Sequence, residues 1–153
     1  MIINRAIHIA SLLFVAGLVL GGCGSVGNDL IHGSSYRPSG PMNGGYSETR
    51  LAPDIARIVF LGNTSTSKER AQDLAMLRAA DLSLQAGFHY LEVLNELDEQ
   101  QSNGSEAASP GALVVYLPRI ELMVHFLNDK PTGKIVFDSA YLMSTLKLKY
   151  NIK

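Results

Sequence analysis

The middle of the chain alternates between apolar and polar stretches in a way that predicts a strand, a helix and a second strand. Residues 57–61 (RIVFL) are rich in β-branched and aromatic side chains and are bounded by turn residues, as a buried strand is. Residues 67–86 are rich in alanine and leucine, and Gly87 provides a left-handed stop for a helix. Residues 88–94 (FHYLEVL) have the composition of the next strand.

The helix is expected to begin with a capping box and to pack on a sheet. In Thr66-Ser67-Lys68-Glu69, the Thr66 hydroxyl can accept from the Glu69 N–H while the Glu69 carboxylate reaches back. The many alanines on its apolar face predict a close approach to the sheet. That face holds Ala71, Leu74, Ala75, Ala79, Leu82 and Ala86, with Leu77 and Leu84 beside it. Strand, helix and strand then predict a βαβ unit with parallel strands and a right-handed crossover.

The second half of the chain completes the sheet. Residues 95–111 are polar and acidic and predict a long loop. Residues 112–127 predict a strand that alternates from Ile120 onward, with Pro118 at an edge, a bulge or a break. Residues 134–137 can form a short fourth strand, and Asp138 can cap a helix that runs through residue 146. Residues 146–153 have the period of a strand, but we expect the helix to be followed by a tail.

Together these elements predict one α+β domain spanning residues 53–153. The sheet is expected to have three to four strands in the order β-α-β-β, then a C-terminal helix, all packed on one long helix. A chain of 153 residues with 46% apolar content has room for one modest domain. The net charge of −1 argues against a nucleic-acid partner, which would require a basic patch.

Residues 1–22 have the pattern of an export signal. Arg5 supplies a positive start, and the apolar run that follows is shorter than the ~20 residues of a spanning helix. The run ends in Leu20-Gly21-Gly22-Cys23, which resembles the lipobox of a bacterial lipoprotein. Cys23 is the only cysteine, so the chain cannot form an internal disulfide. An uncleaved anchor and an ordinary secretory signal are the alternatives, but the latter would need an Ala-x-Ala site, which the sequence lacks.

The lipobox resemblance implies cleavage between Gly22 and Cys23 and lipidation of the Cys23 thiol and amine. Two or more acyl chains hold a protein on a membrane stably, whereas one chain does so only marginally. Gly24 stands where an inner-membrane retention signal would have aspartate, so the resemblance implies the outer membrane, facing the periplasm. Residues 23–52 are then the lipidated cysteine and a flexible tether, because they are rich in glycine and too poor in apolar residues to fold alone.

Two further motifs resemble an uncharacterised family of short proteobacterial lipoproteins. They are Gly45-Tyr46-Ser47-Glu48 and Leu77-Arg78-Ala79-Ala80-Asp81, and the family more often has Glu in the place of Asp81. The resemblance implies lipoprotein status and an α+β fold, and it implies no activity. Residues 46–48 are expected to fold back onto the domain, and a docking tag for a partner is the alternative.

Arg78 and Asp81 are charged residues within or beside the apolar face of the predicted helix. Their spacing of three residues lets them pair. We expect a partly buried structural ion pair, with the arginine stem lying along the apolar face. The alternative is a site for an anionic ligand built on Arg78, and Tyr46 and Glu48 are further candidate binding residues.

Residue patterns for catalysis or metal binding are sparse. His89 and His125 lie on two predicted strands, but two histidines make a weak zinc site because zinc usually takes at least three protein ligands. The sequence contains no Gly-x-Ser-x-Gly motif and no glycine-rich phosphate loop. We therefore predict no catalytic residues, no metal and no cofactor.

Three classes of function remain. The first is a lipid-anchored, non-enzymatic domain that faces the periplasm and binds an envelope protein or organises the envelope. The second is a small-ligand module that uses Arg78 and the sheet face. The third is an enzyme, placed last because no nucleophile, base and orienting group converge in the sequence.

The lipidation hypothesis makes a direct prediction. Cys23→Ser removes the thiol that would receive the lipid, so the variant should accumulate as uncleaved precursor without acyl chains. Mass spectrometry of the purified chain and membrane fractionation measure both effects. If the Ser variant is still cut at the same bond and still fractionates with membranes, the hypothesis is wrong.

Overall fold

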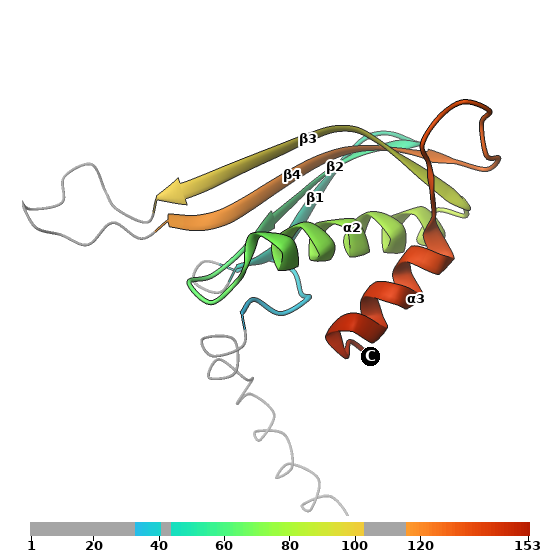
Figure 1. The fold of residues 1–153 in the computed structure, drawn as a ribbon. Helices are drawn as coiled ribbons and strands as arrows, with labels where there is room; N and C mark the ends of the chain where they lie inside the picture. Colours follow the sequence, from blue (N-terminus) through green and yellow to red (C-terminus); the bar gives the residue numbers. More distant parts are fainter. Residues whose placement is uncertain (1–32, 41–43, 103–115) are drawn as a thin grey trace, which may run out of the picture.

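The structure is a computed structural model that describes residues 33–40, 44–102 and 116–153. The predicted signal peptide, Cys23 and the first part of the predicted tether lie outside these residues. The described chain is an α+β domain with one open antiparallel sheet and two helices (Figure 1). The strands are β1 (Gly45–Ala52), β2 (Ile55–Leu61), β3 (Tyr90–Ser102), β4 (Tyr116–Leu127) and β5 (Phe137–Asp138), and the helices are α2 (Lys68–Gln85) and α3 (Ser139–Tyr150).

The sheet has five strands in the order β1-β2-β4-β3-β5, rather than the predicted three to four. β2 and β3 run parallel to each other, as the predicted βαβ unit requires, but they are not neighbours in the sheet. Both pair antiparallel with β4, which lies between them. The β3–β4 register runs from Tyr90↔Leu127 to Ser102↔Tyr116, as in a long hairpin. Pairing β3 with β4 closes a shorter loop than pairing β3 with β2 across α2 would, so it costs less loop-closure entropy.

The polar stretch predicted as a loop from residue 95 is strand as far as Ser102. Its acidic side chains are compatible with a strand because basic and amide groups on α2 pair with them. Gln72 Nε2 donates to Glu96 Oε1 at 2.6 Å, and Lys68 forms an ion pair with Asp98. The rest of that predicted loop lies outside the described residues.

The predicted boundary at residue 53 is too late, because β1 lies within the predicted tether. β1 pairs with β2 from Gly45↔Leu61 onward. Residues 33–40, called the strap from here on, also belong to the domain. Ser34 is fully buried, and the strap runs alongside β1 through the bonds Ser39 N–H to Tyr46 O and Tyr46 N–H to Arg37 O, at 2.7 and 2.9 Å. Both segments are short of apolar residues because they lie at the edge of the sheet, where polar contacts replace burial.

The predicted capping box of Thr66 and Glu69 is wrong, because the helix is capped one residue later and by a single side chain. Ser67 is the N-cap of α2, and its side chain accepts from the Arg70 N–H at 3.1 Å. The Thr66 hydroxyl oxygen is occupied elsewhere, because it accepts from the backbone N–H groups of Ser34 and Asn63. At the other end, Gly87 has the predicted left-handed conformation, with φ of 84°.

The core lies between α2 and the sheet, as the alanine-rich pattern predicted. Ala71, Ala75 and Ala79 are fully buried. The alternation predicted for β4 is confirmed, because Ile120, Leu122, Val124 and Phe126 are buried while the residues between them are half-buried. The other large core side chains are Ile58, Phe60, Leu74, Leu77 and Leu91.

The C-terminal segment is helical further than predicted. The Asp138 side chain accepts from the Tyr141 N–H at 2.9 Å, which confirms the predicted cap. α3 runs to Tyr150 and ends at Asn151, whose φ is 52°. The strand-like alternation after residue 146 is overridden because Leu146 and Tyr150, one helical turn apart, both pack toward the core.

Two glycines with positive φ test how closely the strap lies against β1. A Cβ added at Gly45 would collide with the carbonyl oxygen of Arg37, whereas a Cβ at Gly133 would meet nothing within 4 Å. Gly133→Ala should therefore cost about 1 kcal/mol of unfolding free energy from backbone strain alone. Gly45→Ala should cost about 3 kcal/mol, because the strap must also move. Urea unfolding measures both, and equal costs would contradict the contact.

Candidate functional site

The four candidate binding residues named from the sequence meet in one cluster. Arg78 lies on α2 and forms a bidentate pair with Glu48 on β1, with Nε–Oε2 and Nη2–Oε1 distances of 3.1 and 2.7 Å. Its Nη1 also donates to Asp81 Oδ2 at 2.7 Å, which is the ion pair expected at a spacing of three residues. The Arg78 side chain is only 11% exposed, so these bonds form in a largely desolvated place.

Aromatic rings enclose the same guanidinium group. The Arg78 Cζ lies 4.4 Å from the centroid of the Tyr46 ring, in a cation–π arrangement. The ring of Tyr36, from the strap, lies 4.9 Å from that of Tyr46. The Tyr36 hydroxyl donates to Asp81 Oδ2 at 2.9 Å. Tyr36 is therefore a fifth member of the cluster, and the sequence offered little signal for it because it lies in a glycine- and serine-rich stretch.

The surroundings of the cluster hold Arg78 in its charged form. Burial by itself would lower the pKa of Arg78, but the hydrogen bonds with Glu48 and Tyr36 outweigh it and raise the pKa above its ordinary value. Burial also raises the pKa of Tyr36, and the bond to Asp81 adds to this effect. At neutral pH, the Arg78 guanidinium is therefore charged and the Tyr36 hydroxyl keeps its proton.

This geometry makes the cluster a clamp that joins three segments. Arg78 connects α2 to β1 through Glu48, and Tyr36 connects the strap to α2 through Asp81. Gln85 Nε2 donates to the other oxygen of Asp81 at 2.9 Å. Because two carboxylates already neutralise the guanidinium, an anionic ligand would have to displace one of them. The contacts therefore favour a structural role over the anion site.

A second polar cluster joins α2 to the C-terminal end of α3. Lys149 Nζ lies 2.6 Å from carboxylate oxygens of both Glu69 and Asp73, and the Tyr150 hydroxyl donates to Asp73 at 2.7 Å. The bonds with Asp73 and Glu69 raise the pKa of Lys149. The Arg70 guanidinium lies 4.7 Å from the Tyr150 ring centroid, and its Nε donates to the carbonyl of Ser34 at 3.4 Å. The strap is thus linked to α3 through one side chain.

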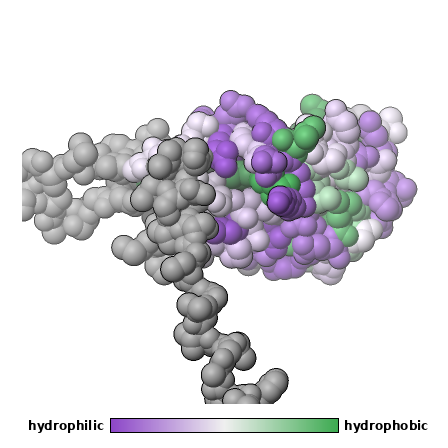
Figure 2. Space-filling model, turned by 90° about the horizontal axis from the view of Figure 1, so that it is seen from below, coloured by the Kyte–Doolittle hydropathy of each residue, from purple (hydrophilic) through white to green (hydrophobic). Residues whose placement is uncertain are grey.

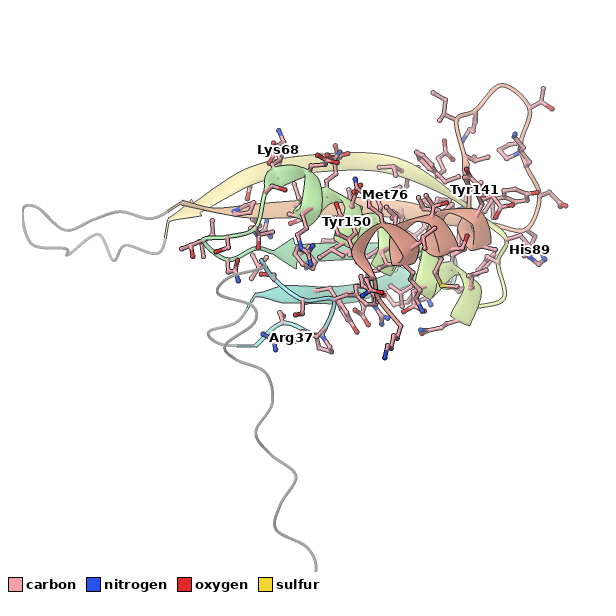
Figure 3. The ribbon with its side chains drawn as sticks, turned by 60° about the horizontal axis from the view of Figure 1, so that its bottom comes forward. Arg37, Lys68, Met76, His89, Tyr141 and Tyr150 are labelled. Atoms are coloured by element: carbon pink, nitrogen blue, oxygen red, sulfur yellow. The ribbon has the colours of Figure 1, made fainter. Side chains whose placement is uncertain are left out.

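The two histidines considered for metal binding have different surroundings and do not form a site together. His125 Nε2 is 3.1 Å from Asp54 Oδ2, and its Nδ1 is 3.8 Å from Glu92. His89 is exposed and lies in the turn before β3, at one end of the molecule (Figure 3). Among the described residues, no group of three or more His, Cys, Asp or Glu side chains is arranged to hold a metal ion.

The sheet face that points away from the helices is called the open face. Both helices lie on the other side of the sheet (Figure 1). The open face mixes aliphatic side chains with ion pairs, such as those of Glu121 with Arg57 and Arg119. Its residues, assigned by the alternation of the strands, are Thr49, Ile55, Arg57, Val59, Leu61, Glu92, Leu97, Glu99, Arg119, Glu121, Met123 and His125.

Comparison of the chain with protein-family models, curated proteins and solved structures gives no match. Among the described residues, no helix is long and apolar enough to cross a membrane. The proposed lipidation and cleavage residues, Cys23 and Gly22, lie outside the described part of the chain.

The clamp can be tested by comparing two arginines. Arg78→Met keeps the apolar stem but leaves two partly buried carboxylates, 32% and 26% exposed, without their cation, so it should lower the unfolding free energy by about 1–3 kcal/mol. Arg57→Met removes a charge that is 46% exposed and should cost less than about 1 kcal/mol. Thermal and urea unfolding provide the measurement.

The control for this prediction also removes the two carboxylates that Arg78 binds. Adding Glu48→Gln and Asp81→Asn to Arg78→Met should restore about 1 kcal/mol, because no carboxylate that lacks its cation remains. If the substitutions show no coupling and Arg78→Met leaves stability unchanged, Arg78 is not a structural partner and the anion-site hypothesis reopens.

Proposed function

We propose that this protein is a lipid-anchored, non-enzymatic domain of the outer membrane that faces the periplasm and binds an envelope protein through its open face. The sequence support is the lipobox ending at Cys23. The structural observation that carries the proposal is the strap. It binds the chain to the helix side of the sheet soon after the proposed lipid attachment point and leaves the opposite side uncovered among the described residues.

The strap sets how far the domain can lie from its anchor. Only residues 24–32 separate Cys23 from Gly33, the first described residue. Even a fully extended chain over these ten steps reaches at most about 35 Å. The predicted tether, residues 24–52, would have allowed a far longer maximum reach. The anchor would therefore hold the domain close to the membrane surface.

The side of the sheet on which the strap lies determines which face of the domain is free to bind a protein partner. Tyr36 and Ser34 contact Asp81 and Arg70, both of which are on α2. The strap is thus on the helix side, and the open face points the other way. Its mixture of aliphatic and charged side chains is typical of a non-obligate protein interface, which is about as apolar as the rest of a protein surface.

The other two classes of function have less support. A small anionic ligand on Arg78 would compete with Glu48 and Asp81, which already bind the guanidinium. An enzyme would need converging catalytic groups, and the polar clusters of the described residues are ion pairs and hydrogen bonds that connect elements of the fold. A binding module is therefore the function that the geometry favours.

The proposal is tested by purifying the acylated full chain from solubilised membranes and identifying co-purified proteins. Wild type should recover a defined stoichiometric envelope protein. Thr49→Glu combined with Leu97→Asp places new charges at two exposed positions of the open face and should reduce recovery at least tenfold. Thr132→Glu, exposed in the loop after β4, is the matched control and should bind as wild type does.

Two results would count against the proposal. If the double variant recovers as much of the envelope protein as wild type does, the open face is not the binding surface. Failure of wild type to retain any stoichiometric protein would remove the binding function.

A further inference from the structure

The side of α3 that points away from α2 is called its outer face, and its exposed side chains are uncharged. α3 contains no acidic residue, and its only charged residues are Lys147 and Lys149. Tyr141 and Leu148 are 72% and 85% exposed. They are seven residues apart, so they lie on the same side of the helix two turns apart. The positions between them on this side are also exposed and uncharged; they are Ser144 and Thr145, with Ala140 adjoining.

The inner face of the same helix is already occupied. Leu146 is buried against the core, and Leu142, Met143 and Tyr150 pack beside it. Tyr141 and Tyr150 mark the two ends of the helix in Figure 3. The exposed leucine and tyrosine are therefore not needed for the packing of α3 on α2.

The chain from the proposed anchor enters the domain beside this helix. Gly33 lies against Arg70, and the Arg70 guanidinium stacks on Tyr150 at the C-terminal end of α3. The strap and α3 also lie on the same side of the sheet (Figure 1). With a reach of at most about 35 Å from Cys23 to Gly33, a lipid on Cys23 would bring this side of the molecule to the bilayer.

We propose that the outer face of α3 lies on the surface of the membrane that holds the anchor. Leu148 and Tyr141 would enter the headgroup region, where leucine and tyrosine side chains are favoured. Lys147 and Lys153 near the C-terminus would attract anionic headgroups. This inference rests on the lipid anchor of the proposed function and assigns α3 as a second contact with the membrane.

The lipid anchor would allow such a small apolar surface to stay bound to the bilayer. Two apolar side chains alone would bind a bilayer weakly, but a tethered contact forms at a high effective concentration. Figure 2 looks at the helix side of the molecule and shows hydrophobic residues at several places among hydrophilic ones. Contact at α3 would orient the domain and turn the open face away from the bilayer.

The absence of tryptophan from the chain permits a clean experiment. Leu148→Trp places a single fluorophore on the outer face of α3, and Leu97→Trp places one on the open face, where Leu97 is 44% exposed. Each acylated full-length variant is reconstituted into vesicles of phosphatidylethanolamine and phosphatidylglycerol that carry brominated acyl chains. Bromine should quench the emission of the variant at position 148 at least threefold more than that of the variant at 97.

Substitution of the lysines tests the electrostatic part of the proposal. Lys147→Glu with Lys153→Glu, in the Leu148→Trp background, should reduce the quenching and make it less dependent on phosphatidylglycerol. Quenching at position 148 no greater than at 97 would overturn the inference. So would a blue shift at 148 that is insensitive to bromine but depends on protein density, since this would indicate a second copy of the chain on this face.

The anchor itself is checked in the same samples. If mass spectrometry finds no acyl chain on Cys23, the anchor of the proposed function fails and the inference fails with it. If Cys23 is acylated and position 148 is not quenched, only the inference fails.

Discussion

A single buried cation holds the edge of this fold in place. The side chain of Arg78 is largely buried between Glu48 and Asp81, so loss of the cation would leave two partly buried carboxylates without an opposite charge. β1 is an edge strand with few apolar residues, and its attachment to α2 depends on this pairing. The aromatic rings of Tyr36 and Tyr46 exclude water from the same place, which strengthens the electrostatic contacts.

The same cluster connects the fold to the proposed membrane anchor. Tyr36 donates to Asp81 and Ser34 is buried against Thr66, so the strap belongs to the domain. Only residues 24–32 lie between Cys23 and the first described residue of the strap. The position of the domain at a membrane would then be set by where the strap docks, which is the helix side beside the end of α3.

The two sides of the sheet have different chemistry and suit different roles. The helix side presents the uncharged outer face of α3 with lysines near its end, which suits a lipid surface. The open face carries aliphatic side chains among ion pairs of Arg57, Arg119 and Glu121, which suits a protein partner. A sheet covered on one side only would therefore give the proposed lipid-anchored domain one face for each proposed neighbour.

Local patterns in the sequence were enough to predict α2, its glycine stop, the alternation of β4, the Asp138 cap and the Arg78–Asp81 pair, because each depends on residues close together in the chain. The sequence also identified Tyr46 and Glu48 as candidate binding residues, because they belong to a motif that resembles one of a known family. The placement of β4 between β2 and β3, the strand character of β1 and the role of Tyr36 were decided only by the tertiary structure. Sheet neighbours depend on which distant segments can pair, and polar edge segments become ordered only when a partner such as Arg78 or Thr66 satisfies their groups.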